Sequence, residues 1–283
     1  MTISPTQGMP PGRTEKSVSD GHHYQPLALG SLISGSFALF ARHLPVFMLI
    51  ALVPTVSLNI IGTVMLPNSL DPLPMRAGVG GRDYAVPNAH LLLLSAISAV
   101  VILLMMATLV LTAHRASHGQ QLLIHRLVGQ TLSAGPAIVI LGAFYLALVG
   151  MGMAALLIPG LYLMARYSVL PMTILADDAG FSSMQRAAQL TEGYRWPIAG
   201  AFTIMLILTA VIVVAITMAP LLIMGGTIET APGEPDFAIL MLIQSLGNAV
   251  QYALIAVFVA QLYSRLREIK DGPGSQDIAA IFE

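Results

Sequence analysis

Long apolar runs, separated by short polar stretches that contain proline, glycine or charge, make up most of this chain. Six of the runs predict membrane-spanning helices, because about 20 apolar residues in a helix cross a hydrocarbon core of about 30 Å. The predicted spans are residues 45–66, 90–113, 136–157, 161–176, 197–224 and 237–263.

Three shorter segments lie before the first, third and fifth spans and have one apolar and one polar side. Each is too short to cross a bilayer, so it predicts an amphipathic helix that lies flat on the membrane surface. The first segment has an alternative interpretation as the frayed beginning of the first span. These segments are residues 27–42, 119–132 and 181–192.

Proline begins the same three spans, at Pro45, Pro136 and Pro197. Proline suits the first turn of a helix because its missing N–H is not needed there. The pattern therefore predicts an all-α polytopic membrane protein with six transmembrane helices. They form three hairpins, each preceded by a cytoplasmic interfacial amphipathic helix.

Local signals predict where some of these elements begin and end. Pro159-Gly160 predicts a tight turn between the third and fourth spans. Ser182 and Gln185 have the spacing of a capping box, and Gly193 can end the surface helix in a left-handed conformation.

Composition supports the assignment to a membrane. Of the 283 residues, 56% are hydrophobic and 10% are charged, whereas soluble domains have about 25% charged residues. Mean hydropathy is +0.79. The net charge of −1 predicts no nucleic-acid partner, and the absence of cysteine excludes thiol chemistry and disulfides. We expect membrane lipids as partners, and no cofactor.

Lysine and arginine are distributed unevenly, and cytoplasmic loops carry the excess of these residues. Their distribution predicts a multi-pass protein of the cytoplasmic (inner) membrane with both termini inside. Residues 26–270 would form the membrane domain, between a disordered tail (1–25) and a second cytoplasmic tail (271–283). The cytoplasmic set is Arg13, Lys16, Arg42, Arg115, Arg126, Arg186, Arg195, Arg265, Arg267 and Lys270, against Arg76 and Arg82 outside.

Polar side chains inside the spans give the main candidate site. Arg166 is a lone charge, and a charge at the centre of a membrane helix costs about 2.5–3.5 kcal/mol on insertion scales. We expect it to point inward and donate to amide oxygens or to backbone carbonyls freed near the prolines, although its side chain could instead reach the interface. The first candidates are Asn59 and a stripe on the sixth span. The stripe is Gln244, Asn248 and Gln251. It is either a polar path for a substrate or a set of interhelical hydrogen bonds.

No pattern predicts catalysis or a metal site. The spans contain no carboxylate, and a metal-dependent phosphodiesterase needs clustered carboxylates and histidines. His114, His118 and His125 could share a helical face, but Gly119 should interrupt that helix. We therefore expect these histidines to be titratable groups near the membrane surface.

The centre of the chain resembles a known family. It reads IPGLYLMARYSVLPMTILADD from Ile158 and QRAAQLTEGYRW from Gln185, and its end reads LYSRLRE from Leu262. These stretches are similar to the bacterial six-helix membrane family called the glycerophosphoryl diester phosphodiesterase membrane domain, and to related families of unknown function. The matching residues are Pro159, Gly160, Arg166, Pro171, Arg186, Leu190, Thr191, Gly193, Trp196, Tyr263, Leu266 and Arg267.

The chain departs from the family pattern at Ala187, where serine is usual, and at Arg265, where aspartate is usual. The resemblance implies a fold and a membrane location rather than an activity. Two functions follow as hypotheses. The first is a structural, membrane-organising or lipid-interacting protein without catalytic activity. The alternative is a small-molecule or lipid transporter whose polar path is lined by spans 1, 4 and 6.

Overall fold

The computed structural model describes residues 29–65, 89–177, 180–223 and 235–272. In these ranges the chain is helical and contains no strand, as predicted. Six segments are long and apolar enough to cross a membrane, which is compatible with a multi-pass membrane protein. The two predicted tails lie outside the described residues, apart from Asp271 and Gly272. The six segments are α2 (Leu44–Met65), α3 (Ala89–Ser117), α5 (Gly135–Ala155), α6 (Leu157–Arg166) with α7 (Leu170–Leu175), α9 (Arg195–Ile223) and α10 (Pro235–Asp271).

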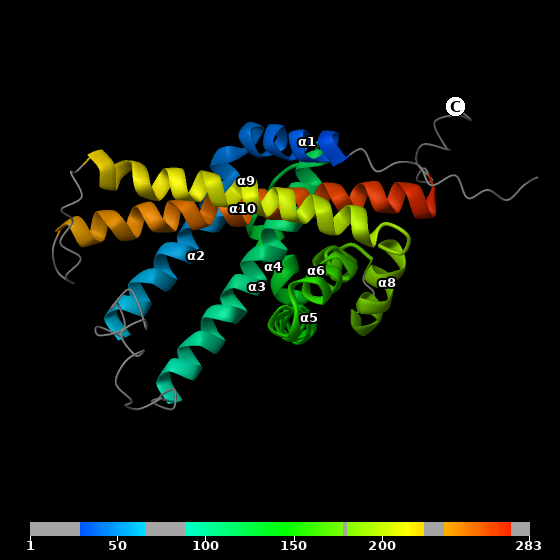
Figure 1. The fold of residues 1–283 in the computed structure, drawn as a ribbon, viewed down its shortest axis with the longest axis horizontal. Coiled ribbons are helices and arrows are strands. Elements are labelled where there is room, and N and C mark those ends of the chain that lie inside the picture. The colour runs from blue at the N-terminus through cyan, green and yellow to red at the C-terminus, as the bar shows by residue number, and fades with distance from the viewer. Residues whose placement is uncertain (1–28, 66–88, 178–179, 224–234, 273–283) are drawn as a thin grey trace, which may run out of the picture.

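Helix α10 lies at the centre of the packing. Its 37 residues give it a length of about 56 Å at 1.5 Å per residue. It packs against α2, α3 and α9, and α9 runs alongside it (Figure 1). Small side chains allow neighbouring membrane helices to approach closely. The buried alanines of α10 are Ala249, Ala253, Ala256 and Ala260.

The buried core lies in one half of the molecule, which we call the closed half. It contains the beginnings of α2 and α9 and the ends of α3 and α10. Typical core residues are Phe47, Leu109, Met205 and Phe258.

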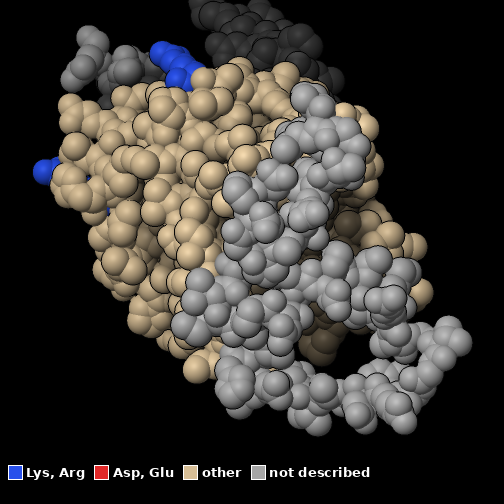
Figure 2. Space-filling model, turned by 90° about the vertical axis from the view of Figure 1, so that its left-hand side faces the viewer, with Lys and Arg blue, Asp and Glu red and all other residues tan. Residues whose placement is uncertain are grey.

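In the opposite, open half the same four helices expose large apolar side chains, and α3 diverges from α9 and α10 (Figure 1). Figure 2 views this side, where the described surface carries charge only near its edge. The exposed residues of the open half include Ile60, Leu92, Leu93, Val211, Val214, Leu242 and Leu246.

Three shorter helices precede α2, α5 and α9 in the chain. They are α1 (Leu29–Arg42), α4 (Ile124–Ser133) and α8 (Ser183–Leu190), the last following the 3₁₀ turn η2 (Gly180–Ser182). Only His43 separates α1 from α2, yet the two helices run in different directions (Figure 1).

The inner face of α1 rests on protein. Ser36 is buried, and its Oγ donates to the carbonyl oxygen of Leu32 at 2.7 Å and lies 3.3 Å from Gln261 Oε1 of α10. Leu32 and Phe40, one turn to either side of Ser36, are buried with it. Part of the apolar face of α1 therefore contacts α10 and cannot contact lipid.

The predicted turn at Pro159-Gly160 is wrong, because the chain turns at Leu156, whose backbone is extended. Pro159 lies in the first turn of α6, where the backbone N–H that proline lacks is not needed for a helical hydrogen bond. Gly160 is needed for helix contact: a Cβ there would lie 2.7 Å from the backbone nitrogen of Met153. The pair of residues thus serves the α5–α6 interface rather than the turn.

The predicted fourth span is not one helix. It breaks after Arg166, and α7 begins at Leu170 with Pro171 in its first turn. Proline lacks the N–H that a continuous helix requires and disfavours helical geometry in the residue before it. The sequence contained this signal at Pro171.

The prolines at positions 45, 136 and 197 lie in the first turns of α2, α5 and α9, as predicted. Gly119 has a φ of 65° just after the end of α3, which confirms the predicted interruption. Gly193 also has a positive φ, of 86°, two residues beyond Thr191, the C-cap of α8. The predicted capping box does not form, because N-cap Ser182 makes no side-chain capping hydrogen bond.

Candidate functional site

Asn59 forms a hydrogen bond with a polar residue of α10, and this residue is Ser245, which is not part of the predicted stripe. Asn59 Nδ2 donates to Ser245 Oγ at 2.8 Å, and the buried Ser245 hydroxyl donates to the carbonyl oxygen of Met241 at 2.7 Å. These contacts join α2 to α10. Gln244 is exposed beside this pair, and Asn248 and Gln251 are half-buried further along α10.

Arg166 takes no part in this contact between α2 and α10. Helix α6 packs against α5 and α9, and the Arg166 guanidinium lies over the Tyr167 ring, 5.3 Å from its centroid. Its Nε is buried and makes no hydrogen bond. The expected donation from Arg166 to Asn59 or the α10 stripe is therefore wrong, since α6 ends at this residue beside α8 and α9.

Two contacts join α6 to the end of α8 and the beginning of α9. The buried Thr191 donates from Oγ1 to the carbonyl oxygen of Arg166, at 2.8 Å. Arg195 Nη1 donates to the Tyr162 hydroxyl at 2.6 Å, and its guanidinium lies 5.5 Å from the centroid of that ring. Trp196, which is 64% exposed, lies next to Tyr162, with ring centroids 6.2 Å apart. We call this region, Tyr162, Arg166, Tyr167, Arg195 and Trp196, the α6–α9 junction.

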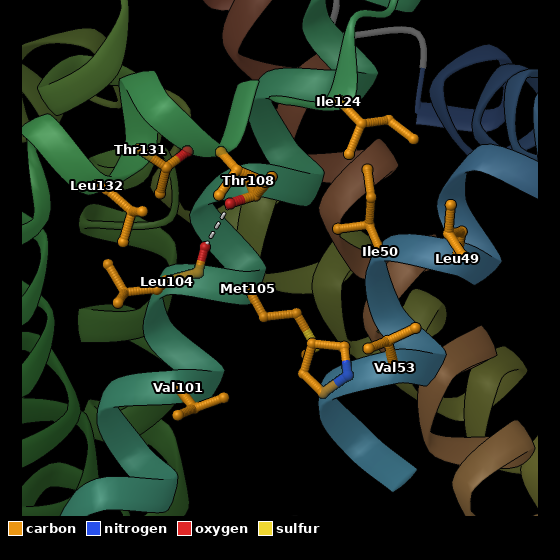
Figure 3. A pocket seen from close by; sticks show the side chains of 12 residues that line it. Leu49, Ile50, Val53, Val101, Leu104, Met105, Thr108, Ile124, Thr131 and Leu132 are labelled. Carbon is orange, nitrogen blue, oxygen red and sulfur yellow. Dashed lines mark hydrogen bonds between the residues drawn. The ribbon is translucent and has the colours of Figure 1, made fainter. Parts of the chain in front are cut away.

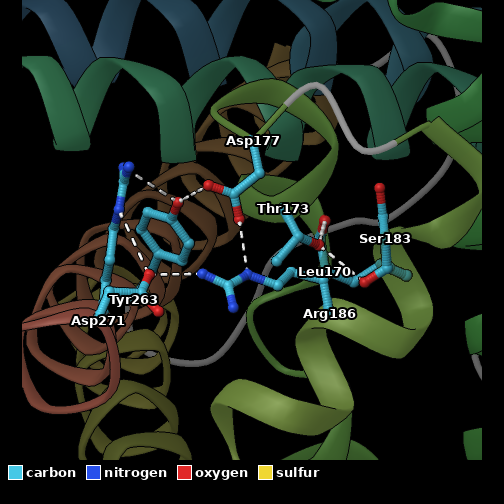
Figure 4. Close-up of polar contacts among 8 residues, drawn as sticks. Leu170, Thr173, Asp177, Ser183, Arg186, Tyr263 and Asp271 are labelled. Atoms are coloured by element: carbon cyan, nitrogen blue, oxygen red, sulfur yellow. Dashed lines mark hydrogen bonds and ion pairs between the residues drawn. The ribbon is translucent and has the colours of Figure 1, made fainter.

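A second polar group, the Asp177 network, lies in the closed half (Figure 4). The fully buried Tyr263 donates from its hydroxyl to Asp177 Oδ1 at 2.7 Å. Arg186 Nη2 donates to Asp271 Oδ2 at 2.5 Å, and its Nε lies 3.6 Å from Asp177 Oδ2. Arg267 completes the network, 3.5 Å from the Tyr263 hydroxyl and 3.9 Å from Asp271.

This network connects α8, α10 and the segment after α7. Within it two arginines face two aspartates, so its charges compensate one another. Next to it, Thr173 of α7 donates to the carbonyl oxygen of Ser183 at 3.1 Å, which also ties α7 to α8 (Figure 4). The arrangement fixes helices to one another.

Sequence reasoning missed the Asp177 network as a unit. It named Arg186 and Arg267 among the expected cytoplasmic arginines and in the family resemblance, and Tyr263 in the resemblance alone. The partners are 86 positions apart in the case of Asp177 and Tyr263, and no local spacing reveals such a pair.

The histidines do not converge on a metal. His114 Nδ1 lies 3.2 Å from Ser264 Oγ, and the His114 ring meets the Tyr263 ring edge-on at 5.7 Å. His118 Nδ1 bonds the carbonyl oxygen of His114 at 2.8 Å, and His125 is exposed on α4. Among the residues that the structure describes, no three histidine, aspartate or glutamate side chains form a metal-binding group.

An apolar groove of about 390 Å³ lies between α2, α3 and α4 (Figure 3). Its two polar side chains are Thr108 and Thr131, and each hydroxyl donates to a carbonyl oxygen of its own helix, at 2.8 and 3.0 Å. The groove therefore offers no unsatisfied polar group to a ligand. Its lining is Leu49, Ile50, Val53, Pro54, Val101, Leu104, Met105, Thr108, Ile124, Val128, Thr131 and Leu132.

Comparison with known proteins finds no matching family model, no matching curated protein and no matching solved structure. The family resemblance of the central segment therefore stays a prediction. Any function has to be argued from the geometry of the chain itself.

Proposed function

We propose that this chain is an integral membrane protein without catalytic activity that binds lipid and helps to organise the cytoplasmic membrane. The apolar groove between α2, α3 and α4 carries this proposal. It lies on helices that are long and apolar enough to span a bilayer, and Leu49, Val53 and Leu132 on its rim are exposed. A phospholipid acyl chain is the apolar molecule that such a rim would meet.

The proposed architecture is three hairpins, each preceded by a cytoplasmic surface helix. Packing of α2 on α3, of α5 on α6 and of α9 on α10 supports the hairpins. Val128 and Leu132 of α4 are exposed, whereas Leu127 and Thr131 are buried. Helix α4 thus has apolar side chains free for lipid. The family resemblance leads to the same six-helix expectation.

The transport alternative receives less support. It requires a continuous polar path lined by spans 1, 4 and 6, yet Asn59 is hydrogen-bonded to Ser245 and Arg166 lies at the α6–α9 junction. An interhelical hydrogen bond is the simpler role for Asn59.

Photocross-linking tests the proposed function. The protein is reconstituted in vesicles of phosphatidylcholine that carries a diazirine in one acyl chain, and the cross-linked peptides are identified by mass spectrometry. We expect several-fold more cross-links in residues 49–54 and 124–132 than in residues 207–214 of α9. The latter stretch also exposes large apolar side chains, at Ile207, Val211 and Val214.

Filling the groove provides the matched control. Val128→Trp should place its ring in the groove and reduce the cross-links there, whereas Val211→Trp, on the exposed face of α9, should not. Equal labelling of both regions, unchanged by Val128→Trp, would show that no acyl chain occupies the groove and would refute this function.

A further inference from the structure

The arginines of the α6–α9 junction differ from those that form ion pairs. Arg186, Arg265 and Arg267 each lie within 4 Å of a carboxylate oxygen. Among the described residues, neither Arg166 nor Arg195 forms an ion pair, and the Nε of each is buried without a hydrogen bond. Glu192, the carboxylate nearest to Arg195 along the chain, is exposed and pairs with neither arginine.

A guanidinium without an anion is costly next to a bilayer. Removing its hydration costs several kcal/mol unless an anion and hydrogen bonds replace the water. The planar guanidinium matches phosphate especially well, because it donates two parallel hydrogen bonds to phosphate oxygens. Two such groups with free donors therefore favour a phosphate ligand.

The structure brings the two residues to one place. Thr191, four residues before Arg195, donates to the backbone carbonyl of Arg166. Tyr162, one turn before Arg166 on α6, accepts a hydrogen bond from Arg195. The positive end of the α9 dipole is at the same point, since α9 begins at Arg195. Helix N-termini bind phosphate for this reason.

The aromatic side chains indicate the depth of the junction. Tryptophan and tyrosine gather at the level of the lipid headgroups, where one end of the ring is apolar and the other is hydrated. Trp196 is largely exposed beside Tyr162, and it directly follows Arg195. The guanidinium groups are thus placed at the level of lipid phosphates.

We propose that Arg166 and Arg195 bind the phosphate of an anionic phospholipid headgroup at the α6–α9 junction. The site rests on the proposed lipid interaction and specifies the class of lipid. Arg195 would donate with the remaining N–H groups of Nη1 and Nη2, whose other hydrogens are directed to Tyr162 and, at 3.5 Å, to the carbonyl oxygen of Ala188. Arg166 would donate with its two terminal nitrogens.

Trp196 provides the measurement, because it is the only tryptophan in the chain. The protein is reconstituted in mixed vesicles in which either phosphatidylglycerol or phosphatidylcholine carries bromine on its acyl chains. Bromine quenches tryptophan fluorescence on contact, so quenching reports the lipid next to Trp196. We expect brominated phosphatidylglycerol to quench several-fold more than its mole fraction predicts, and brominated phosphatidylcholine correspondingly less.

Variants identify the arginines. Arg166→Gln and Arg195→Gln should each reduce this selectivity, and both together should abolish it. Arg126→Gln is the control, since Arg126 is an exposed arginine on α4. Equal quenching by both lipids in the unaltered protein would refute the headgroup site without any variant.

Two further outcomes separate the alternatives. Selectivity that disappears when millimolar inorganic phosphate is added would assign the site to a soluble phosphate anion and overturn the lipid assignment. Absence of quenching by either brominated lipid would place Trp196 outside the bilayer. That result would contradict both the headgroup site and the position of α9 in the membrane, whereas equal quenching contradicts only the headgroup site.

Discussion

Tyr263 joins the end of α10 to Asp177 through its hydroxyl. It is fully buried, and its hydroxyl is the only hydrogen-bond donor that the described residues offer to Asp177. Tyr263→Phe should destabilise the protein by about 1–3 kcal/mol, because it leaves a largely buried carboxylate oxygen without its hydrogen bond. Thermal stability in detergent, followed by size-exclusion chromatography after heating, measures the loss.

Tyr252→Phe is the matched control, since Tyr252 lies on the same helix outside the Asp177 network. It should leave the apparent melting temperature nearly unchanged. If Tyr263→Phe proves equally harmless, the network contributes nothing measurable to stability.

Arg166 illustrates what residue-level reasoning can predict. A lone charge in an apolar run identifies a residue that needs a special environment, and the structure does give Arg166 an aromatic neighbour and a buried Nε. Its neighbours were not predictable, because they depend on where α6 ends. Arg195 was missed as a partner because in the sequence it is one of many arginines expected at the cytoplasmic surface.

At the scale of elements, the α5–α6 contact depends on two glycines that face each other. A Cβ at Gly152 would lie 2.9 Å from the Gly160 Cα, and a Cβ at Gly160 would lie 2.7 Å from the Met153 nitrogen. Gly160→Ala should push the helices apart and cost about 1–3 kcal/mol, as overpacking does. The same heating assay should show a clearly lower melting temperature.

Gly150→Ala tests the same change in open space, because nothing lies within 4 Å of a Cβ there. The stability of this variant should match that of the unaltered chain. A Gly160→Ala protein as stable as Gly150→Ala would mean that α5 and α6 do not approach as closely as described.

The beginnings of helices were easier to predict than their interruptions. Proline at positions 45, 136 and 197 has a local reason to lie in a first turn, and the structure has it there. The turn at Leu156 has no such signal, since it arises where α6 folds back against α5. Pro171 signalled the break before α7, but the apolar run around it led to the prediction of one continuous span.

At the scale of the molecule, charge predicts the orientation. The described residues of the open half, 56–65, 89–102, 206–223 and 235–248, contain no lysine or arginine, whereas Arg42, Arg115, Arg186 and Arg267 lie in the closed half. The closed half should therefore face the cytoplasm. Because the chain has no cysteine, single cysteines can report this orientation.

In sealed vesicles of known orientation, a membrane-impermeant maleimide should label Thr230→Cys only from the outside. It should label His118→Cys, at an exposed position beyond α3, only from the cytoplasmic side. Labelling of position 230 from the cytoplasmic side alone would reverse the orientation.

The central place of α10 also bears on how the protein is made. Helices enter the membrane in the order of their synthesis, and α10 follows every other described helix in the chain. Until it is inserted, α1, α2, α3 and α9 lack the helix against which they pack most extensively. Until then only the contacts among the earlier helices, such as α5 on α6 and α2 on α3, can form. A ribosome that stops before residue 249 therefore releases a chain that lacks the buried alanines of α10.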